Sequence, residues 1–111
     1  MSEARDMRIV ALWRDDPTEA PMTVDARIVD ARIASTWDLF GAFDLEGAGM
    51  RPFILRRDGG IDFGAGIERW RTDLREAEIR IGANFSVWFN ETDSGLYRIV
   101  KIAALGAKDG L

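Results

Sequence analysis

The sequence predicts a mainly β protein, a small antiparallel β-barrel or compact sandwich of six to seven short strands, with at most one short helix around 66–77 or 35–43. Three observations predict this fold class. Short segments in which apolar and polar residues alternate recur along the chain, as in strands with one buried face. Turn-forming glycine and aspartate residues separate these segments. The last segment, 95–105, has apolar residues on both faces, which is typical of a strand covered on both sides.

The length of the chain suits one domain, which we expect to span residues 1–111 with frayed ends at 1–6 and 106–111. At 111 residues, surface scaling indicates that folding buries about two thirds of the surface that the unfolded chain exposes. No apolar run approaches the roughly 20 residues of a membrane helix. No apolar stretch long enough for a signal peptide follows the charged start, so we expect a cytoplasmic protein without a membrane contact.

The first strand is expected at residues 7–13, before an acidic turn at 15–17. A direct repeat follows, because VDARI occurs at 24–28 and again at 29–33. Five is odd and the strand period is two, so a flat strand would place the apolar residues of the two copies on opposite faces. A β-bulge or sharp bend near residue 28 would bring both copies to one core. We therefore expect a bent strand.

The middle of the chain contains one further strand and one hairpin. Residues 37–45 alternate and predict a strand, although Ser35 or Thr36 could instead cap a helix. The apolar run at 51–57, the turn Asp-Gly-Gly and a second apolar run predict a β-hairpin.

The segment after this hairpin has the only strong helical spacing, because Ile67, Trp70, Leu74 and Ala77 recur every three or four residues. The flanking patterns favour a strand up to about Arg71. A turn or a single helical segment is then expected over 72–78.

The C-terminal hairpin is predicted to begin with a long strand at 78–90. Its odd positions are apolar and its even positions are polar, with the exception of Trp88. A four-residue loop at 92–95 would place Trp88 opposite Ile99 and beside Tyr97 on the outer face. A three-residue loop closing on Gly95 would instead move Tyr97 and Ile99 into the core. Both registers fit the pattern.

The composition excludes several kinds of chemistry. The chain has no cysteine and no histidine, which removes disulfides, thiolate nucleophiles, Ser-His-Asp triads and most zinc and non-haem iron sites. Enzymes that use carboxylates, Tyr, Lys or Arg remain compatible with the sequence, as does a magnesium site made of carboxylates. No catalytic motif is recognisable, so the sequence favours a non-enzymatic function without a metal or other cofactor.

The net charge of −4 disfavours nucleic acid as a partner. Among the basic residues, an arginine cluster is the candidate site for a phosphate or another anion. Its members are Arg51, Arg56, Arg57, Arg69 and Arg71. The simpler interpretation is a solvated face paired with neighbouring acids.

The predicted function is binding of a protein partner, or of a second copy of the chain as a homodimer, through an aromatic patch on the C-terminal hairpin. The patch comprises Trp88, Tyr97 and Ile99, because aromatic residues are enriched at interface hot spots. The structural alternative is a second small core in which Trp70 or the N-terminal strand covers Trp88. The second functional hypothesis is a small-ligand, nucleotide or nucleic-acid binding barrel that uses the arginine cluster.

Overall fold

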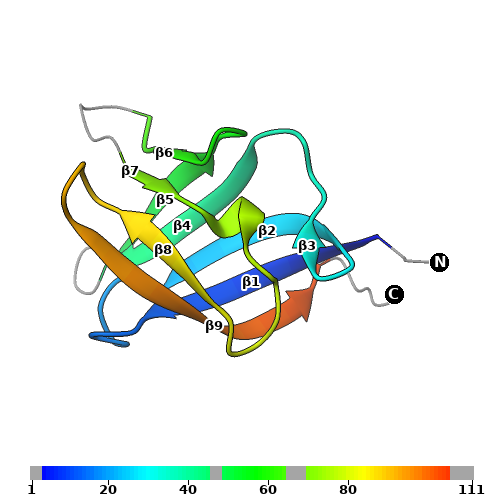
Figure 1. Cartoon of the computed structure of the whole chain (residues 1–111), viewed down its shortest axis with the longest axis horizontal. Helices are drawn as coiled ribbons and strands as arrows, with labels where there is room; N and C mark the ends of the chain where they lie inside the picture. The colour runs from blue at the N-terminus through cyan, green and yellow to red at the C-terminus, as the bar shows by residue number, and fades with distance from the viewer. Residues whose placement is uncertain (1–3, 46–48, 65–69, 106–111) are drawn as a thin grey trace.

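The computed structural model describes residues 4–45, 49–64 and 70–105, and within these ranges the chain forms a closed antiparallel β-barrel (Figure 1). The elements are β1 (Arg5–Trp13), β2 (Met22–Val29), β3 (Arg32–Ile33), β4 (Leu39–Leu45), β5 (Gly49–Leu55), β6 (Gly60–Asp62), β7 (Trp70–Thr72), the 3₁₀ helix η1 (Leu74–Glu76), β8 (Asn84–Trp88) and β9 (Ser94–Ala104).

Eight strands close the barrel in the order β1-β9-β8-β7-β6-β5-β4-β2, and β2 pairs again with β1. The ninth strand, β3, pairs only with β2 and lies outside the ring (Figure 1). The predicted fold class is therefore confirmed, although the described residues contain more strands than the expected six to seven. No helix in the described ranges is long and apolar enough to cross a membrane.

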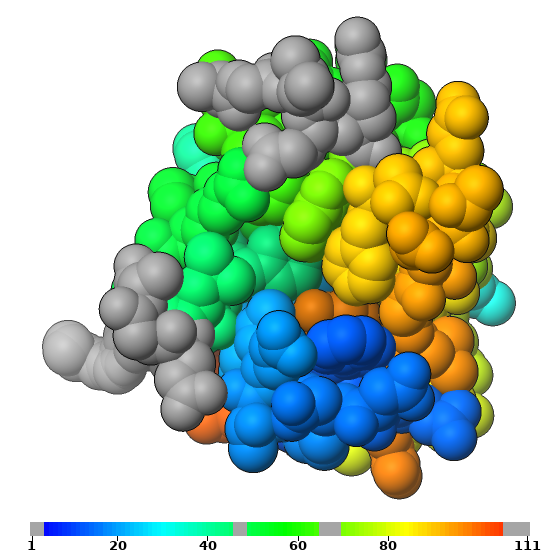
Figure 2. All heavy atoms as spheres, turned by 90° about the vertical axis from the view of Figure 1, so that its left-hand side faces the viewer, coloured from blue at the N-terminus to red at the C-terminus, as the bar shows by residue number. Residues whose placement is uncertain are grey.

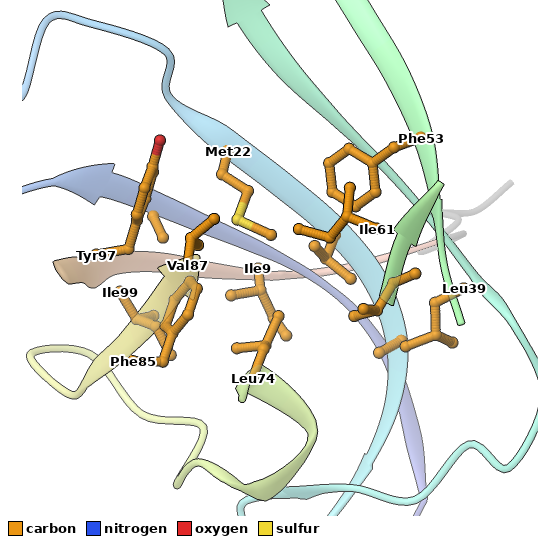
Figure 3. Close-up of a cluster of buried hydrophobic side chains, with 14 of the residues drawn as sticks. Ile9, Met22, Leu39, Phe53, Ile61, Leu74, Phe85, Val87, Tyr97 and Ile99 are labelled. Atoms are coloured by element: carbon orange, nitrogen blue, oxygen red, sulfur yellow. The ribbon is translucent and has the colours of Figure 1, made fainter. Parts of the chain in front are cut away.

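The core lies inside the barrel and follows from the alternation of the strands (Figure 3). On β1, Ile9 and Ala11 are buried whereas Arg8 faces out, and η1 adds Leu74 to the same cluster. Residues 5 and 6, from the expected N-terminal end of 1–6, belong to β1 and pair with β2. Residues 1–3 and 106–111 lie outside the described part of the chain.

The direct repeat forms a tight hairpin, so the predicted bent strand is wrong. Asp30 and Ala31 have φ values of 52° and 61°. Two successive residues with positive φ are typical of a type I′ turn, which suits a two-residue hairpin loop. Ile28 then pairs with Ile33, and both pack against the core. A reversal of the chain, rather than a bulge, brings the two copies to the same core.

The middle of the chain follows its predicted pattern. Residues 39–45 form β4, so the helical alternative at 35–43 is wrong. The hairpin of β5 and β6 turns at Gly59, whose φ is +91°. The strand β7 and the helix η1 match the expected strand up to about Arg71 and the single helical segment after it. The first part of the proposed helix, at 65–69, lies outside the described residues.

The long strand predicted at 78–90 is shorter in the structure, because β8 begins at Asn84. Gly82 has a φ of +94°, and its N–H donates to the Ile99 carbonyl while the Ile99 N–H donates to the Ala83 carbonyl. Two residues thus oppose one, which is a β-bulge. The pairing that follows sets Phe85 opposite Tyr97.

This register leaves five residues, 89–93, between β8 and β9, so the four-residue loop is wrong. Relative to the pairing expected for a four-residue loop, the register is shifted by an odd number of residues. Tyr97 and Ile99 therefore face the core, as expected for the three-residue loop closing on Gly95. A second bulge interrupts the pairing of β1 with β9, where Val10 faces Lys101 but Ala11 faces Ile99. The extra residue at position 100 moves the inward-facing positions of β9 from odd to even residue numbers, so that Ile99 and Ile102 both contact the core. The apolar residues at both odd and even positions therefore do not require that both faces of β9 are covered.

Candidate functional site: an aromatic cavity at one end of the barrel

A cavity of about 260 Å³ opens at the end of the barrel that faces the viewer in Figure 2. Side chains from the N-terminal region (blue), from β4 and β5 (green) and from the β8–β9 hairpin (yellow to orange) surround this hollow (Figure 2). The lining residues are Trp13, Glu19, Ala20, Phe43, Leu45, Arg51, Phe63, Trp70, Phe89 and Tyr97. Six of these ten side chains are aromatic, so the walls are mostly apolar.

The strand ends position these aromatic side chains. Trp13 is the last residue of β1, Trp70 is the first of β7, and Phe89 directly follows β8. Neighbouring strands are antiparallel, so the end of one strand lies beside the beginning of the next. Residues that are far apart in the sequence therefore meet at one end of the barrel.

Trp70 is the centre of the aromatic wall. Its ring centroid lies 4.8 Å from that of Phe89, 5.1 Å from that of Phe63 and 5.5 Å from that of Phe43. All three contacts are edge-to-face, an arrangement that aromatic pairs prefer. These contacts restrict the movement of the Trp70 ring.

Tyr97 contributes a neutral hydroxyl to this end of the barrel. The residue is 1% exposed, and its hydroxyl donates to the Ala20 carbonyl over 3.0 Å. Burial raises the pKa of Tyr97 to about 12, and the nearby Glu19 carboxylate adds to this shift. The hydroxyl therefore stays protonated over the physiological range.

Trp13 contains a polar atom without a partner. Its indole Nε1 is buried and makes no hydrogen bond among the described residues. The indole edge packs over Gly95, where a Cβ would lie only 2.7 Å from Nε1. Gly95 was expected in the turn, but it lies in β9 and permits this close approach. A buried donor without an acceptor costs roughly 1–3 kcal/mol.

Arg51, a member of the predicted arginine cluster, lines the cavity. Its guanidinium carbon lies 3.8 Å from the centroid of the Phe63 ring, a cation–π contact. Glu19, which is exposed, also lines the cavity. One positive and one negative side chain therefore flank an otherwise apolar cavity.

The other arginines of the predicted cluster lie elsewhere. Arg56 forms an ion pair with Asp62, and Arg57 is exposed in the turn between β5 and β6. Along β5 this turn lies roughly 16 Å from Arg51 at about 3.3 Å per residue. Arg71 stacks on Trp88, and Arg69 is outside the described residues. The structure does not bring the described members together in one cluster.

The predicted patch on the C-terminal hairpin is divided between the two faces of the sheet. Tyr97 and Ile99 are 1% and 0% exposed in the core, so their placement on the outer face is wrong. Trp88 is half-buried on the outer face, where the Arg71 guanidinium lies 4.0 Å from its ring centroid. Trp70, proposed as a cover for Trp88, lines the cavity instead.

Sequence reasoning missed most of the cavity wall, namely Trp13, Phe43, Phe63 and Phe89. The available signal was the position of large aromatic residues at or just beyond the ends of apolar segments. That signal does not show which segment ends lie together in space.

Other features of the described residues are weaker candidates for a functional site. No group of three or more acidic residues within them is placed to hold a metal ion. A hollow of about 390 Å³ lies beside Trp37, but two of the residues that line it, Asp6 and Arg27, pair with each other over 3.0 Å. The aromatic cavity is therefore the best candidate site.

Comparisons of the chain with protein-family models, with curated proteins and with solved structures return no match.

Proposed function

We propose that the protein binds a small, mainly apolar molecule, about the size of one or two fused aromatic rings, in the cavity at the end of the barrel. The observation that supports this most directly is the volume of about 260 Å³ together with the six aromatic lining residues. A dry apolar cavity of about 150 Å³ is enough to bind benzene. Eight-stranded barrels commonly hold one small ligand, and mouths of barrels are frequent ligand sites.

The ring contacts support binding to a preformed site. Because Trp70 is held by three neighbouring rings, little side-chain freedom remains to be lost when a ligand enters. A flat ligand would remove apolar surface from water on both partners, at about 25 cal/mol per Å². Catalysis has less support, because Tyr97, with a pKa of about 12, does not act as a base near neutral pH.

The test uses a variant in which the tryptophans outside the cavity are replaced, Trp37→Phe with Trp88→Phe. The two remaining indole N–H signals in a ¹H–¹⁵N spectrum, from Trp13 and Trp70, then both report on the cavity. Titration with the neutral probe 2-naphthamide should shift both signals saturably.

A blocking variant makes the test specific to the cavity. Leu45→Tyr in the same background adds a ring to the cavity lining and should weaken 2-naphthamide binding at least about tenfold, or 1.4 kcal/mol. Val10→Tyr adds the same ring to the outer face of β1 and should change nothing. Indole signals that do not move, or equal affinities of the two tyrosine variants, would contradict the proposal.

A protein contact, including self-association, is the second candidate, and a different surface favours it. Phe40 on β4 is 72% exposed and Met50 on β5 is 56% exposed. Their outward-facing neighbours include the cross-strand pairs of Phe40 with Ile54 and of Ala42 with Pro52. Exposed apolar patches of this kind mark contact sites. Sedimentation equilibrium should show a mass above that of the monomer that Phe40→Ser reduces; a monomeric parent protein contradicts self-association.

A further inference from the structure

The charged groups beside the cavity differ in how strongly they act on a bound molecule. Arg51 is half-buried, and its guanidinium lies against Phe63, a wall of the cavity. Glu19 is exposed, so water screens its charge more strongly. The Arg51 guanidinium therefore lies against the apolar wall, while the Glu19 carboxylate also acts on the cavity, as its effect on the Tyr97 pKa indicates.

The shape of the guanidinium group favours a particular partner. Arginine presents five N–H donors in a planar fork that matches a carboxylate bidentately. Because it has five donors, Arg51 can bind a carboxylate while it keeps other contacts. Its place over Phe63 puts the fork beside the wall of the cavity.

The other polar groups of the cavity wall add little charge. The Trp13 Nε1 is buried beside Gly95, so a ligand in the cavity does not reach it. The Tyr97 hydroxyl is neutral and donates to the Ala20 carbonyl, so it adds no net charge to the cavity. The Glu19 carboxylate disfavours a ligand with two negative charges, which limits the match to a monoanion.

We infer that the ligand is a small aromatic carboxylate, whose ring enters the aromatic cavity and whose carboxylate binds Arg51 beside it. The inference rests on the proposed function, since it needs the cavity to be a binding site. It adds the charge and the orientation of the ligand. A nucleotide is disfavoured by the same geometry, because several phosphate charges would face Glu19 and the cavity holds few polar atoms.

The test compares three probes with one ring system and different charges, in the Trp37→Phe, Trp88→Phe background. The probes are 2-naphthoate, 2-naphthamide and 2-naphthylmethylamine, which are an anion, a neutral molecule and a cation. Hydrogen bonds to charged groups are strong enough that 2-naphthoate should bind about tenfold to a hundredfold more tightly than 2-naphthamide. The amine should bind the most weakly.

Arg51→Met should reduce the preference for 2-naphthoate over 2-naphthamide to about twofold or less. The readout is this ratio of affinities, and saturable shifts of the Trp13 and Trp70 signals by 2-naphthamide show that the variant is folded and still has a cavity. Arg51→Lys, which keeps the charge but not the fork, should retain only part of the preference. Arg57→Met removes an exposed arginine in the distant β5–β6 turn and should leave the preference unchanged.

The outcomes separate the two proposals. Equal affinities for 2-naphthoate and 2-naphthamide, or tightest binding of the amine, would overturn the carboxylate inference while the cavity remained a binding site. An unchanged preference in Arg51→Met would overturn it too. Failure of all three probes to move the Trp13 and Trp70 signals would overturn the proposed function, and the inference with it.

Discussion

Replacing Arg75 with alanine is expected to destabilise the protein far more than its place on a short 3₁₀ helix suggests. Its guanidinium donates to four backbone carbonyls from two other segments. The distances are 2.9 Å to Ser35, 2.7 Å to Trp37, 3.2 Å to Leu55 and 2.9 Å to Arg56. One side chain thus ties the loop before β4 to the end of β5.

The magnitude follows from these four bonds. A hydrogen bond to a charged group contributes about 1.5–3 kcal/mol, but such values are not additive within one network. Arg75 is half-buried, so water can hydrate part of the carbonyls that the truncation leaves. We therefore expect Arg75→Ala to lower the free energy of unfolding by roughly 2–4 kcal/mol, which corresponds to roughly 8–17 °C in Tm for a chain of this length.

Urea denaturation followed by near-UV circular dichroism measures this change, and equal m-values validate the comparison. Arg80→Ala is the matched control, since Arg80 is exposed and pairs with Glu78 over 2.7 Å. An exposed pair contributes about 0–1 kcal/mol. Arg75→Lys should recover less than half of the loss, because an ammonium cannot reach four carbonyls in the fork geometry. A loss below about 1 kcal/mol, or one equal to that of Arg80→Ala, would refute the reasoning.

Three further predictions concern single positions. Gly41→Ala should cost roughly 1–3 kcal/mol in urea denaturation, because its Cβ would lie 2.4 Å from Phe53 Cζ; no change would contradict this packing. Tyr97 is the only tyrosine, and its absorbance should titrate near pH 12 in the folded protein and near pH 10 in urea. Because the pKa of Tyr97 is raised in the folded state, its contribution to stability is complete below pH 10 and is lost as the pH rises toward 12. Tyr97→Phe should remove this part of the loss of stability at alkaline pH. An unchanged dependence of stability on pH in this variant would contradict the prediction. Trp88→Ala should lower stability by about 1 kcal/mol through the lost contact with Arg71, yet leave 2-naphthamide binding unchanged; weaker binding would place Trp88 at the cavity.

Local signals predicted those parts of the fold whose geometry is decided within a few residues. The Asp-Gly-Gly turn is one case, because Gly59 supplies the positive φ that the hairpin requires. The direct repeat shows the limit of such signals. Asp30 and Ala31 are not a usual type I′ pair, yet they adopt that conformation, since pairing of Ile28 with Ile33 buries both side chains against the core.

The register of the C-terminal hairpin depended on a loop whose length sequence pattern alone could not select. In the structure, the Asn90 side-chain oxygen accepts hydrogen bonds from the backbone N–H groups of Thr92 and Asp93. These bonds stabilise a five-residue connection, and its length decides that Tyr97 faces the core. The wrong assignment of Tyr97 and Ile99 to the outer face therefore came from the turn, while the alternation of side chains along β8 was predicted correctly.

The sequence by itself determined the fold class, because alternating segments divided by turns can bury their apolar faces only by packing as antiparallel strands. It also determined the absence of histidine and cysteine chemistry. Only the tertiary structure decided where the aromatic residues meet. Trp13, Trp70 and Phe89 are separated by long stretches of chain, and closure of the barrel brings their strand ends to one cavity. The physical reason is that periodicity assigns a side chain to a face, whereas strand order and register assign its neighbours.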